Sequence, residues 1–387
     1  MNASSKRLRI ALTLMAGTFF LASVYALQGT LLTSIIDHFQ LESSVQGLPS
    51  SAAFIGACVA LVLSLICIGR VSRVTLLTGS AGLCAVGLVL VSFAPSFATF
   101  LLSWALIGVA IGFIDALLSS TMATLYTGRQ STHMMCCMHT MYGLGSMVTA
   151  PAYAFLMKKG IVWNHVYLFT AALGALVAMA YAVFAGSAKD VLPESEEKFS
   201  LPLLKTLLKR GILPILICAD FCNGLFMGGM TTWITRYVSQ TFNENLGAMT
   251  LTWLFLGVLI SRLSIAFLPI NAKKYLVWSG PATFAAFLIA CLSANGTLAM
   301  AAIVLAGICF GAMIPCMLDF GCSTFTESTM LVSTPMLIAY YIGQGLGSPM
   351  VGFFENQVSL SFGLIVCAGM LVVNSLFCWI AVKKYKG

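Results

Sequence analysis

The sequence predicts an all-α membrane protein with twelve transmembrane helices in two pseudo-symmetric six-helix halves. Three observations support this fold class: the composition, the length of the apolar runs and an internal repeat. The chain has 387 residues, of which 59% are hydrophobic and only 8% are charged. A water-soluble globule cannot bury so much apolar surface, so we expect this chain to lie in lipid.

Apolar runs that are long enough to cross a bilayer recur along the whole chain. A helix of about 20 residues spans a hydrocarbon core of about 30 Å. The first run follows Lys6, Arg7 and Arg9 as in a signal peptide, but it is long and no convincing cleavage site follows it, so we expect it to be retained. The expected spans are 8–32, 45–68, 74–93, 97–124, 132–157, 163–186, 212–236, 246–268, 275–293, 297–321, 331–355 and 358–382.

The distribution of basic residues predicts a multi-pass protein of the cell membrane with both termini in the cytoplasm. All but three of the 20 Lys and Arg residues then lie in cytoplasmic segments or their flanks, the exceptions being Lys158, Lys159 and Arg236. The net charge of +8 therefore reports membrane topology. The basic residues are not interleaved with aromatic residues, so we expect no nucleic-acid binding. The 13 cysteines lie mostly in apolar runs, which argues against a disulfide framework.

A single extended polar segment divides the chain. Residues 187–211 carry prolines and charges of both signs, and we expect them to be a cytoplasmic linker. The linker joins an N-terminal six-helix half, residues 1–186, to a C-terminal half, residues 212–387.

Small residues recur at the same offset in the two halves. Gly108 and Gly112 in span four are matched 199 residues later by Gly307 and Gly311 in span ten. A similar offset relates the start of the Tyr-Gly motif in span five to its counterpart in span eleven: Tyr142, Gly143 and Gly145 match Tyr341, Gly343 and Gly345. Each glycine pair alone is compatible with plain helix packing. The shared offset indicates a duplicated unit, as in many secondary transporters.

Several energy sources and enzyme classes are excluded by missing motifs. The sequence has no phosphate-binding loop of the G-x-x-x-x-G-K-[ST] type, no soluble ATPase domain and no large cytoplasmic insert. The glycines of residues 343–349 lie inside a membrane helix and not after a strand, so they are no dinucleotide cradle. We expect a gradient-driven transporter that is not an enzyme and has no cofactor.

The 6 plus 6 layout, the central loop and the sequence GRVSR at 69–73 resemble the major facilitator superfamily, over essentially the whole chain. Arg70 and Arg73 fit the basic positions of that family's signature between spans two and three, whereas Gly69 stands where the family usually has an aspartate. The second-half counterpart, GVLISR, keeps its glycine and Arg262.

Within that superfamily, GVAIGFIDALLSS at 108–120 and MHTMYGLGSMVTAP at 138–151 are similar to the fucose permease and related sugar–proton symporters. The shared features are the aspartate in span four, here Asp115, and the H-x-x-Y-G-x-G motif that begins at His139. Ser119 stands where that group often has an asparagine. The resemblance implies symport of a proton with a small polar solute such as a sugar.

Asp115 and His139 lie at similar depth in the expected spans four and five. Asp115 is about nine or ten residues before the inner end of its span and His139 about seven after the inner start, which places both roughly 10 to 15 Å from the cytoplasmic surface. A carboxylate beside an imidazole in a helix bundle can take up and release a proton near neutral pH. The alternative is a hydrogen-bonded pair that locks two helices.

The second half offers a further polar set. Arg262 could form a cytoplasmic gate ion pair with Asp319 or Asp220, or could simply neutralise buried charge. Together with the two arginines of the basic signature, the candidate gate or signature residues are Arg70, Arg73, Arg262 and Asp319. Residues that could line a substrate cavity, or could simply pack in the core or against lipid, are Tyr25, Gln28, Tyr142, Asp220, Asn223, Trp233, Tyr341 and Gln344.

The stretch HMMCCMHTMYGLG at 133–145 is rich in soft metal ligands. His133 and His139 lie about 120° apart around a helix, so one metal ion cannot bind all the soft ligands of this stretch. We expect no metal site. The function that we expect is proton-coupled symport of a small-molecule substrate by a monomer in the lipid bilayer. The alternatives are a proton-driven exporter of amphipathic compounds or drugs, and a non-transporting membrane sensor or assembly subunit.

Overall fold

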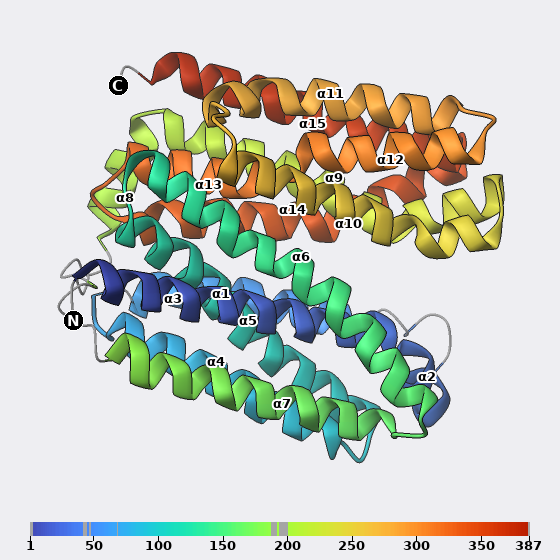
Figure 1. Ribbon diagram of the computed structural model, residues 1–387, viewed down its shortest axis with the longest axis horizontal. Helices are drawn as coiled ribbons and strands as arrows, with labels where there is room; N and C mark the ends of the chain where they lie inside the picture. The colour runs from blue at the N-terminus through green and yellow to red at the C-terminus, as the bar shows by residue number, and fades with distance from the viewer. Residues whose placement is uncertain are drawn as a thin grey trace. The chain divides into compact units, whose positions relative to one another are not determined.

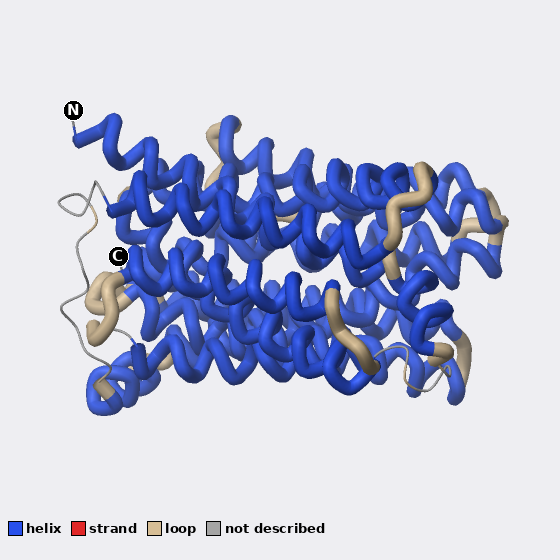
Figure 2. The backbone as a smooth tube through the Cα atoms, turned by 90° about the horizontal axis from the view of Figure 1, so that it is seen from below, coloured by secondary structure: helices blue, strands red, loops and turns tan. Residues whose placement is uncertain are grey.

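The computed structural model describes residues 3–41, 45, 48–67, 69–186, 192 and 200–385, and these residues are almost entirely helical (Figure 1, Figure 2). The helices are α1 (Ala3–Thr30), α2 (Leu32–Phe39), α3 (Leu48–Cys67), α4 (Arg73–Ser92), α5 (Phe97–Leu125), α6 (Gly128–Lys158), α7 (Trp163–Ala180) with a π-helical turn (Tyr181–Ala185), α8 (Leu201–Lys209), α9 (Ile212–Thr241), α10 (Glu244–Phe267), α11 (Ala272–Leu292), α12 (Gly296–Phe310), α13 (Met313–Thr324), α14 (Thr329–Gln357) and α15 (Leu360–Lys384).

Each of the twelve expected spans coincides with a long helical segment, if α12 and α13 count as one span. Nine segments in the described part of the chain are long and apolar enough to cross a membrane. The other three are α3, whose described apolar part is Ser51–Cys67, and the longer helices α6 and α14, which carry many polar side chains. The described residues form helices and no strand, as the sequence predicts.

The helices group into two compact units. Unit 1 comprises Met1–Thr127, Met141–Ser200 and Ser328–Thr334, and unit 2 comprises Gly128–Thr140, Leu201–Glu327 and Pro335–Gly387. Each unit therefore takes one short segment from the other half of the sequence: the start of α6 belongs to unit 2, and the start of α14 belongs to unit 1. The predicted boundaries at residues 186 and 211 follow chain order and stay a prediction.

A close helix crossing holds α3 against α5 in unit 1. A Cβ atom added to Gly108 would collide with the carbonyl oxygen of Ala53, and one added to Gly112 would lie 2.9 Å from the Cα of Ala57. The glycine pair that the sequence singled out therefore brings two helix backbones into contact.

Unit 2 repeats this crossing between α10 and α12. A Cβ atom on Gly307 would collide with the carbonyl oxygen of Leu254, and one on Gly311 would lie 2.6 Å from the Cα of Val258. The repeat inferred from the 199-residue offset thus corresponds to the same kind of packing in both units.

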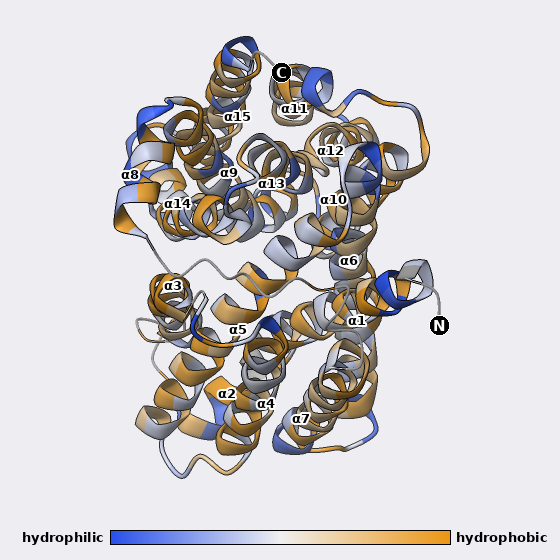
Figure 3. Ribbon diagram, turned by 90° about the vertical axis from the view of Figure 1, so that its left-hand side faces the viewer, coloured by the Kyte–Doolittle hydropathy of each residue, from blue (hydrophilic) through white to orange (hydrophobic). Residues whose placement is uncertain are grey.

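Aromatic side chains fill the interior of each unit. In unit 2 the ring of Phe226 lies edge to face with Phe287 and Phe310, at centroid distances of 5.6 and 4.9 Å. In unit 1 the buried rings of Trp104 and Tyr167 are 6.1 Å apart. Figure 3 shows that hydrophobic residues predominate along the helices, while hydrophilic residues gather at helix ends and in loops.

Span ten, which the sequence predicts as one continuous helix, is broken at Gly311 and Ala312. Pro315 explains the break because it has no N–H to donate to the carbonyl of Gly311, and its ring crowds that carbonyl. The carbonyl of Gly311 accepts a hydrogen bond from Nε of Arg262 at 2.9 Å instead. The N–H of Ala312 donates to the hydroxyl of Tyr275 at 3.0 Å. Side chains from α10 and α11 thereby pair two backbone groups at the break.

Candidate functional site

Asp115, the expected proton carrier, is half-buried in the middle of α5. Asp115 belongs to unit 1 and His139 belongs to unit 2. The contact between the two side chains that the sequence suggests therefore stays a prediction. Nε2 of His139 is buried and has no hydrogen-bond partner among the described residues. The carbonyl of His139 accepts a hydrogen bond from Nη1 of Arg262, so a guanidinium group lies beside this peptide.

Tyr25 and Tyr142 bring α1 and α6 together in unit 1. Their half-buried rings lie edge to face with centroids 6.0 Å apart and an interplanar angle of 61°. Such a pair offers both apolar ring surface and phenol hydroxyls to a solute. Gln28 lies one turn after Tyr25 on α1, but its side chain is outside the part of the chain that the structure describes.

The two arginines of the basic signature have different surroundings. Arg70 is exposed in the turn after α3, whereas Arg73, the first residue of α4, is buried. Nη1 of Arg73 donates to the carbonyl of Ser120 at 3.4 Å and to the hydroxyl of Thr124 at 3.2 Å. Arg73 thus holds the start of α4 against the C-terminal end of α5, where the helix dipole favours a cation.

Asp319 on α13 is held by two hydroxyl groups at the start of α6. One carboxylate oxygen accepts from Ser131 at 2.6 Å and the other accepts from Thr132. These two residues were not among the predicted site residues, and their only signal in the sequence is a polar pair next to the His- and Cys-rich stretch. The expected ion pair of Arg262 with Asp319 or Asp220 stays a prediction.

Asp220 and Asn223 on α9 are almost completely buried in unit 2, with exposed fractions of 2% and 1%. None of their side-chain polar atoms has a hydrogen-bond partner among the described residues. The neighbouring carbonyl of Ala219 accepts from Nδ2 of Asn374 on α15 at 2.7 Å. The role of Asp220 and Asn223 as substrate-cavity residues stays a prediction.

The three remaining cavity candidates lie where α9 meets α14. The indole N–H of Trp233 donates to the carbonyl of Ser348 at 3.0 Å and lies 3.1 Å from its hydroxyl. Tyr341 is buried, with its ring centroid 5.8 Å from that of Tyr340. Gln344 is half-buried, and its backbone lies directly against glycines of α9. Trp233 therefore fastens α14 to α9.

The His- and Cys-rich start of α6 is engaged in ordinary helix contacts. Nδ1 of His133 lies 2.6 Å from the carbonyl oxygen of Ala266, and Nε2 lies 3.8 Å from the Sγ of Cys137. In the described part of the chain, no three His, Cys, Asp or Glu residues form a group that could hold a metal ion.

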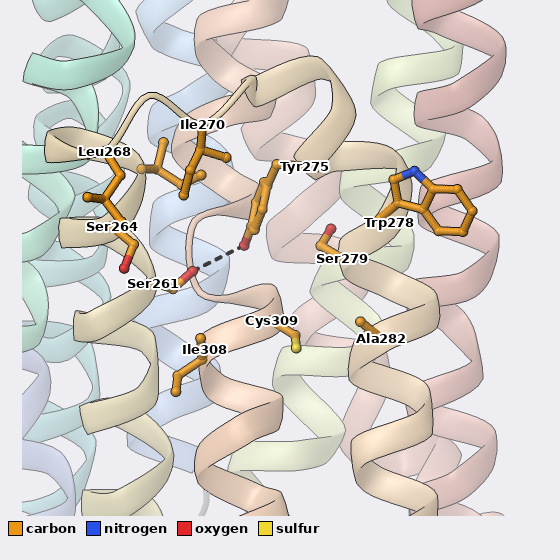
Figure 4. Close-up of a pocket in the computed structure, with 11 residues that line it drawn as sticks. Ser261, Ser264, Leu268, Ile270, Tyr275, Trp278, Ser279, Ala282, Ile308 and Cys309 are labelled. Atoms are coloured by element: carbon orange, nitrogen blue, oxygen red, sulfur yellow. Dashed lines mark hydrogen bonds between the residues drawn. The ribbon is translucent and has the colours of Figure 1, made fainter.

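Unit 2 also contains a cavity of about 360 Å³ among α10, α11 and α12, shown in Figure 4. None of the predicted site residues lines it. Its wall includes Leu268, Ile270, Tyr275, Trp278, Ile308 and Cys309. The sequence analysis did not find this cavity or the role of Tyr275, because both depend on segments that meet only in the folded chain.

The fold and these polar groups define the class of protein: a multi-pass membrane transporter built from a repeated helical unit. The chain belongs to the major facilitator superfamily, whose family model matches residues 14–348. This superfamily consists of secondary transporters and not of enzymes, so the predicted class is confirmed.

Curated relatives match a limited part of the chain. Proteins described as TsgA homologs from Yersinia pestis (strain Pestoides F) and Yersinia pseudotuberculosis (serotype O:3) are 26% identical to it over 147 residues. The match covers 38% of this chain and 36% of theirs. The aligned part is thus little more than a third of the length of these relatives.

Solved transporter structures match almost the whole chain. A variant of the E. coli fucose:proton symporter FucP has a TM-score of 0.81 at 16% identity, covering 97% of this chain and 99% of that one. The proton:xylose symporter XylE, bound to 6-bromo-6-deoxy-D-glucose, has a TM-score of 0.79 at 14% identity, covering 98% and 96%. The human organic anion transporter MFSD10 (TETRAN) has a TM-score of 0.74 at 13% identity, covering 96% and 99%. At these identities the likeness shows the fold alone.

Proposed function

We propose that this chain is a proton-coupled symporter of a small polar solute such as a sugar, working by alternating access. The observation that carries the proposal is Asp115, a half-buried carboxyl group in the middle of an apolar span. A carboxylate at this depth is costly unless it is neutral or paired, and uptake of a proton makes it neutral. Reversible protonation of Asp115 is therefore a means of coupling the proton gradient to helix movement.

His139 tunes this step and does not carry the proton itself. The guanidinium group of Arg262 lies beside the peptide of His139, so a second positive charge on the imidazole would be repelled. The matching depth of His139 and Asp115 in the sequence supports a neighbouring role for the imidazole.

The choice of a sugar-like solute rests on the chemistry of the aromatic pair. Tyr25 and Tyr142 combine ring faces with hydroxyl groups, which suits a solute that has both C–H faces and hydroxyls. Two proteins of the same fold, FucP and XylE, are proton-coupled symporters of fucose and xylose. Their names support the proposal, although the sequence identity is too low to transfer their substrates.

Transport by purified protein in liposomes tests the proposal. Candidate sugars are first found by a thermal-shift screen, since a solute that binds the folded state raises its stability. We expect Asp115→Asn to keep substrate exchange across the membrane and to lose accumulation driven by a pH gradient. The matched control is Asp37→Asn, an exposed aspartate on the short helix α2, which should accumulate substrate normally.

Two outcomes would contradict this assignment. Normal, pH-dependent accumulation by Asp115→Asn would move the coupling role to Asp220 or Asp319. We expect His139→Ala to shift the pH profile of uptake, and an unchanged profile would remove His139 from the mechanism.

A second candidate function is proton-driven export of amphipathic compounds. The likeness to a human organic anion transporter and the aromatic side chains Tyr340 and Tyr341 favour it. Stabilisation of the purified protein by hydrophobic ions and not by any sugar would support export.

We also propose that both termini face the cytoplasm, as the basic residues require. A cysteine introduced near Glu196, which lies outside the described residues, should not react with an impermeant reagent added to intact cells. Strong labelling from outside would show that the segment around Glu196 faces the exterior and would contradict the proposed orientation.

A further inference from the structure

The cavity among α10, α11 and α12 is open at the surface of unit 2. Three large apolar side chains in its wall are strongly exposed: Trp278 at 71%, Leu268 at 51% and Ile270 at 42%. Figure 4 shows that Tyr275 lies in the middle of the cavity and that Trp278 lies at its edge. The exposed part of the wall is therefore apolar, which favours an apolar occupant such as an acyl chain.

The mouth of the cavity lies at the end of unit 2 that carries the C-terminus. Nζ of Lys273 is 3.5 Å from the ring centroid of Tyr385, which follows α15. In the expected orientation this end faces the cytoplasmic leaflet. Trp278 is then an aromatic residue exposed near the membrane surface, where such residues are favoured.

Basic residues lie beside the mouth along the chain. Between Glu244 and Asp319 the sequence includes every residue of the cavity wall and has no acidic residue, and its basic residues are the buried Arg262 together with Lys273 and Lys274. Lys274 is exposed and lies one helical turn before Trp278 on α11. The first turn of α11 also presents the positive end of its helix dipole. This charge is complementary to an anionic headgroup.

We propose that this cavity, defined by α10, α11 and α12, binds one anionic phospholipid of the cytoplasmic leaflet. An acyl chain fills the apolar wall beside Tyr275 and Trp278, and the headgroup phosphate lies at Lys274. The binding itself does not depend on the transported substrate or on proton coupling.

The bound acyl chain also contacts Tyr275, whose hydroxyl is hydrogen-bonded to the backbone at the break in span ten. The hydroxyl of Tyr275 accepts from the N–H of Ala312 at 3.0 Å and lies 3.3 Å from the hydroxyl of Ser261. Arg262, the next residue on α10, bonds the carbonyl of Gly311 on the other side of the same break. An acyl chain packed on the Tyr275 ring restricts the movement of that ring. The lipid therefore stabilises the joint between α12 and α13.

Lipid retention by the purified protein tests the binding. The protein is titrated with phosphatidylglycerol or phosphatidylcholine, and bound lipid and thermal midpoint are measured by native mass spectrometry and thermal unfolding. We expect one tightly retained phosphatidylglycerol and a larger rise in midpoint than with phosphatidylcholine. Equal retention and equal midpoint shifts for the two lipids would overturn the headgroup assignment.

Two pairs of variants test whether the binding is specific to this cavity. The first pair controls for the loss of any basic charge, and the second controls for the addition of any large side chain. Lys274→Ala should raise the half-saturating phosphatidylglycerol concentration at least fivefold, whereas Lys383→Ala, which removes a basic charge at the same end of unit 2, should not. Ala282→Trp, which fills the cavity, should abolish retention, whereas Leu376→Trp on exposed α15 surface should not. Equal effects within either pair would overturn the proposal.

A measurement on the unaltered protein covers the case in which Ala282→Trp fails to fold. Phosphatidylglycerol with a photoreactive acyl chain should label peptides of α10, α11 and α12 that border the cavity. Labelling confined to other helices would overturn the site. Because none of these measurements uses transport, they are independent of the proposed symport.

Discussion

Spans four and ten begin in the same way and end differently. In both, two glycines four residues apart bring the helix onto the backbone of a neighbour, α3 for span four and α10 for span ten. After the second glycine, α5 continues unbroken to Leu125, whereas span ten breaks and restarts as α13. Position 315 is proline, and the residue 199 positions earlier is Ala116.

The comparison shows how one residue makes a joint from a repeated helix. Ala116 has an N–H that can continue the helical hydrogen bonds of α5, and Pro315 has none. Unit 2 compensates with Arg262 and Tyr275, whose side chains pair the backbone groups of the break. Span four instead carries Asp115, where the matching position in span ten is Ile314. At these two matched positions, span four has the carboxyl group and span ten has the proline at the joint.

The shared crossing should give the largest effect when it is disturbed. Gly108→Ala and Gly307→Ala each place a Cβ against a carbonyl oxygen of the facing helix. We expect each to lower the thermal midpoint clearly and to destabilise the protein by about 3 kcal/mol or more, at or above the upper end of the range for overpacking, because the added Cβ meets backbone atoms that cannot move aside easily. Gly79→Ala is the control, because an added Cβ there meets nothing within 4 Å. If all three variants unfold at the same temperature, the crossings are not close contacts.

The joint itself can be tested by restoring the missing N–H. Arg262→Ala should destabilise the protein by about 1.5–3 kcal/mol, because it leaves carbonyl groups without a charged donor. In a Pro315→Ala background the helix can pair the carbonyl of Gly311 itself, so the same change should cost at least about 1 kcal/mol less. Thermal unfolding of the two single variants and the double variant measures this coupling. Strict additivity would separate Arg262 from the break.

Tyr275→Phe should have a smaller effect that is confined to the joint. It removes one hydroxyl that accepts from Ala312, which corresponds to about 0.5–1.5 kcal/mol. We expect faster hydrogen exchange in peptides that contain Ala312. Tyr237→Phe is the control, since it removes a comparable hydrogen bond to the carbonyl of Cys291, on α11. Faster exchange at Ala312 in both variants would show a general loosening of unit 2.

The smallest expected effect on stability comes from a difference between the starts of spans five and eleven. Span five begins at Gly128, with a φ of 58°, and 199 residues later Glu327 precedes span eleven and pairs with Arg210. A hydrogen bond from its own backbone N–H and the charge of Arg210 together lower the pKa of Glu327, against a smaller effect of burial. A lowered pKa stabilises the fold above the ordinary value of 4.5, and this contribution is lost as the pH falls through the folded-state pKa.

Glu327→Gln measures this contribution. Both partners are partly exposed, so we expect a loss below about 1 kcal/mol at pH 7 that vanishes in acid. Thermal midpoints of the wild type and the variant across the acid range provide the test. A difference that grows as the pH falls would contradict the sign.

The residues most easily predicted from sequence are those whose role depends on neighbours in the chain. The spans follow from local apolar composition, and the glycine pairs follow from spacing along one helix. The basic signature pointed to Arg73 but not to its contacts, which hold α4 against α5. The break at Gly311 had a local signal as well, because a proline follows four residues later, but the sequence analysis did not use it.

The sequence by itself determined that the chain is a helical membrane protein with two related halves, because composition, run length and spacing are properties of short segments. Only the tertiary structure decided which groups pair. Arg262 meets Gly311 across 49 positions and Trp233 meets Ser348 across 115, while Asp319 accepts from Ser131 across 188. Such partners are chosen by which helix faces come together, since a polar group in an apolar bundle must bond whatever donor or acceptor the packing brings within reach.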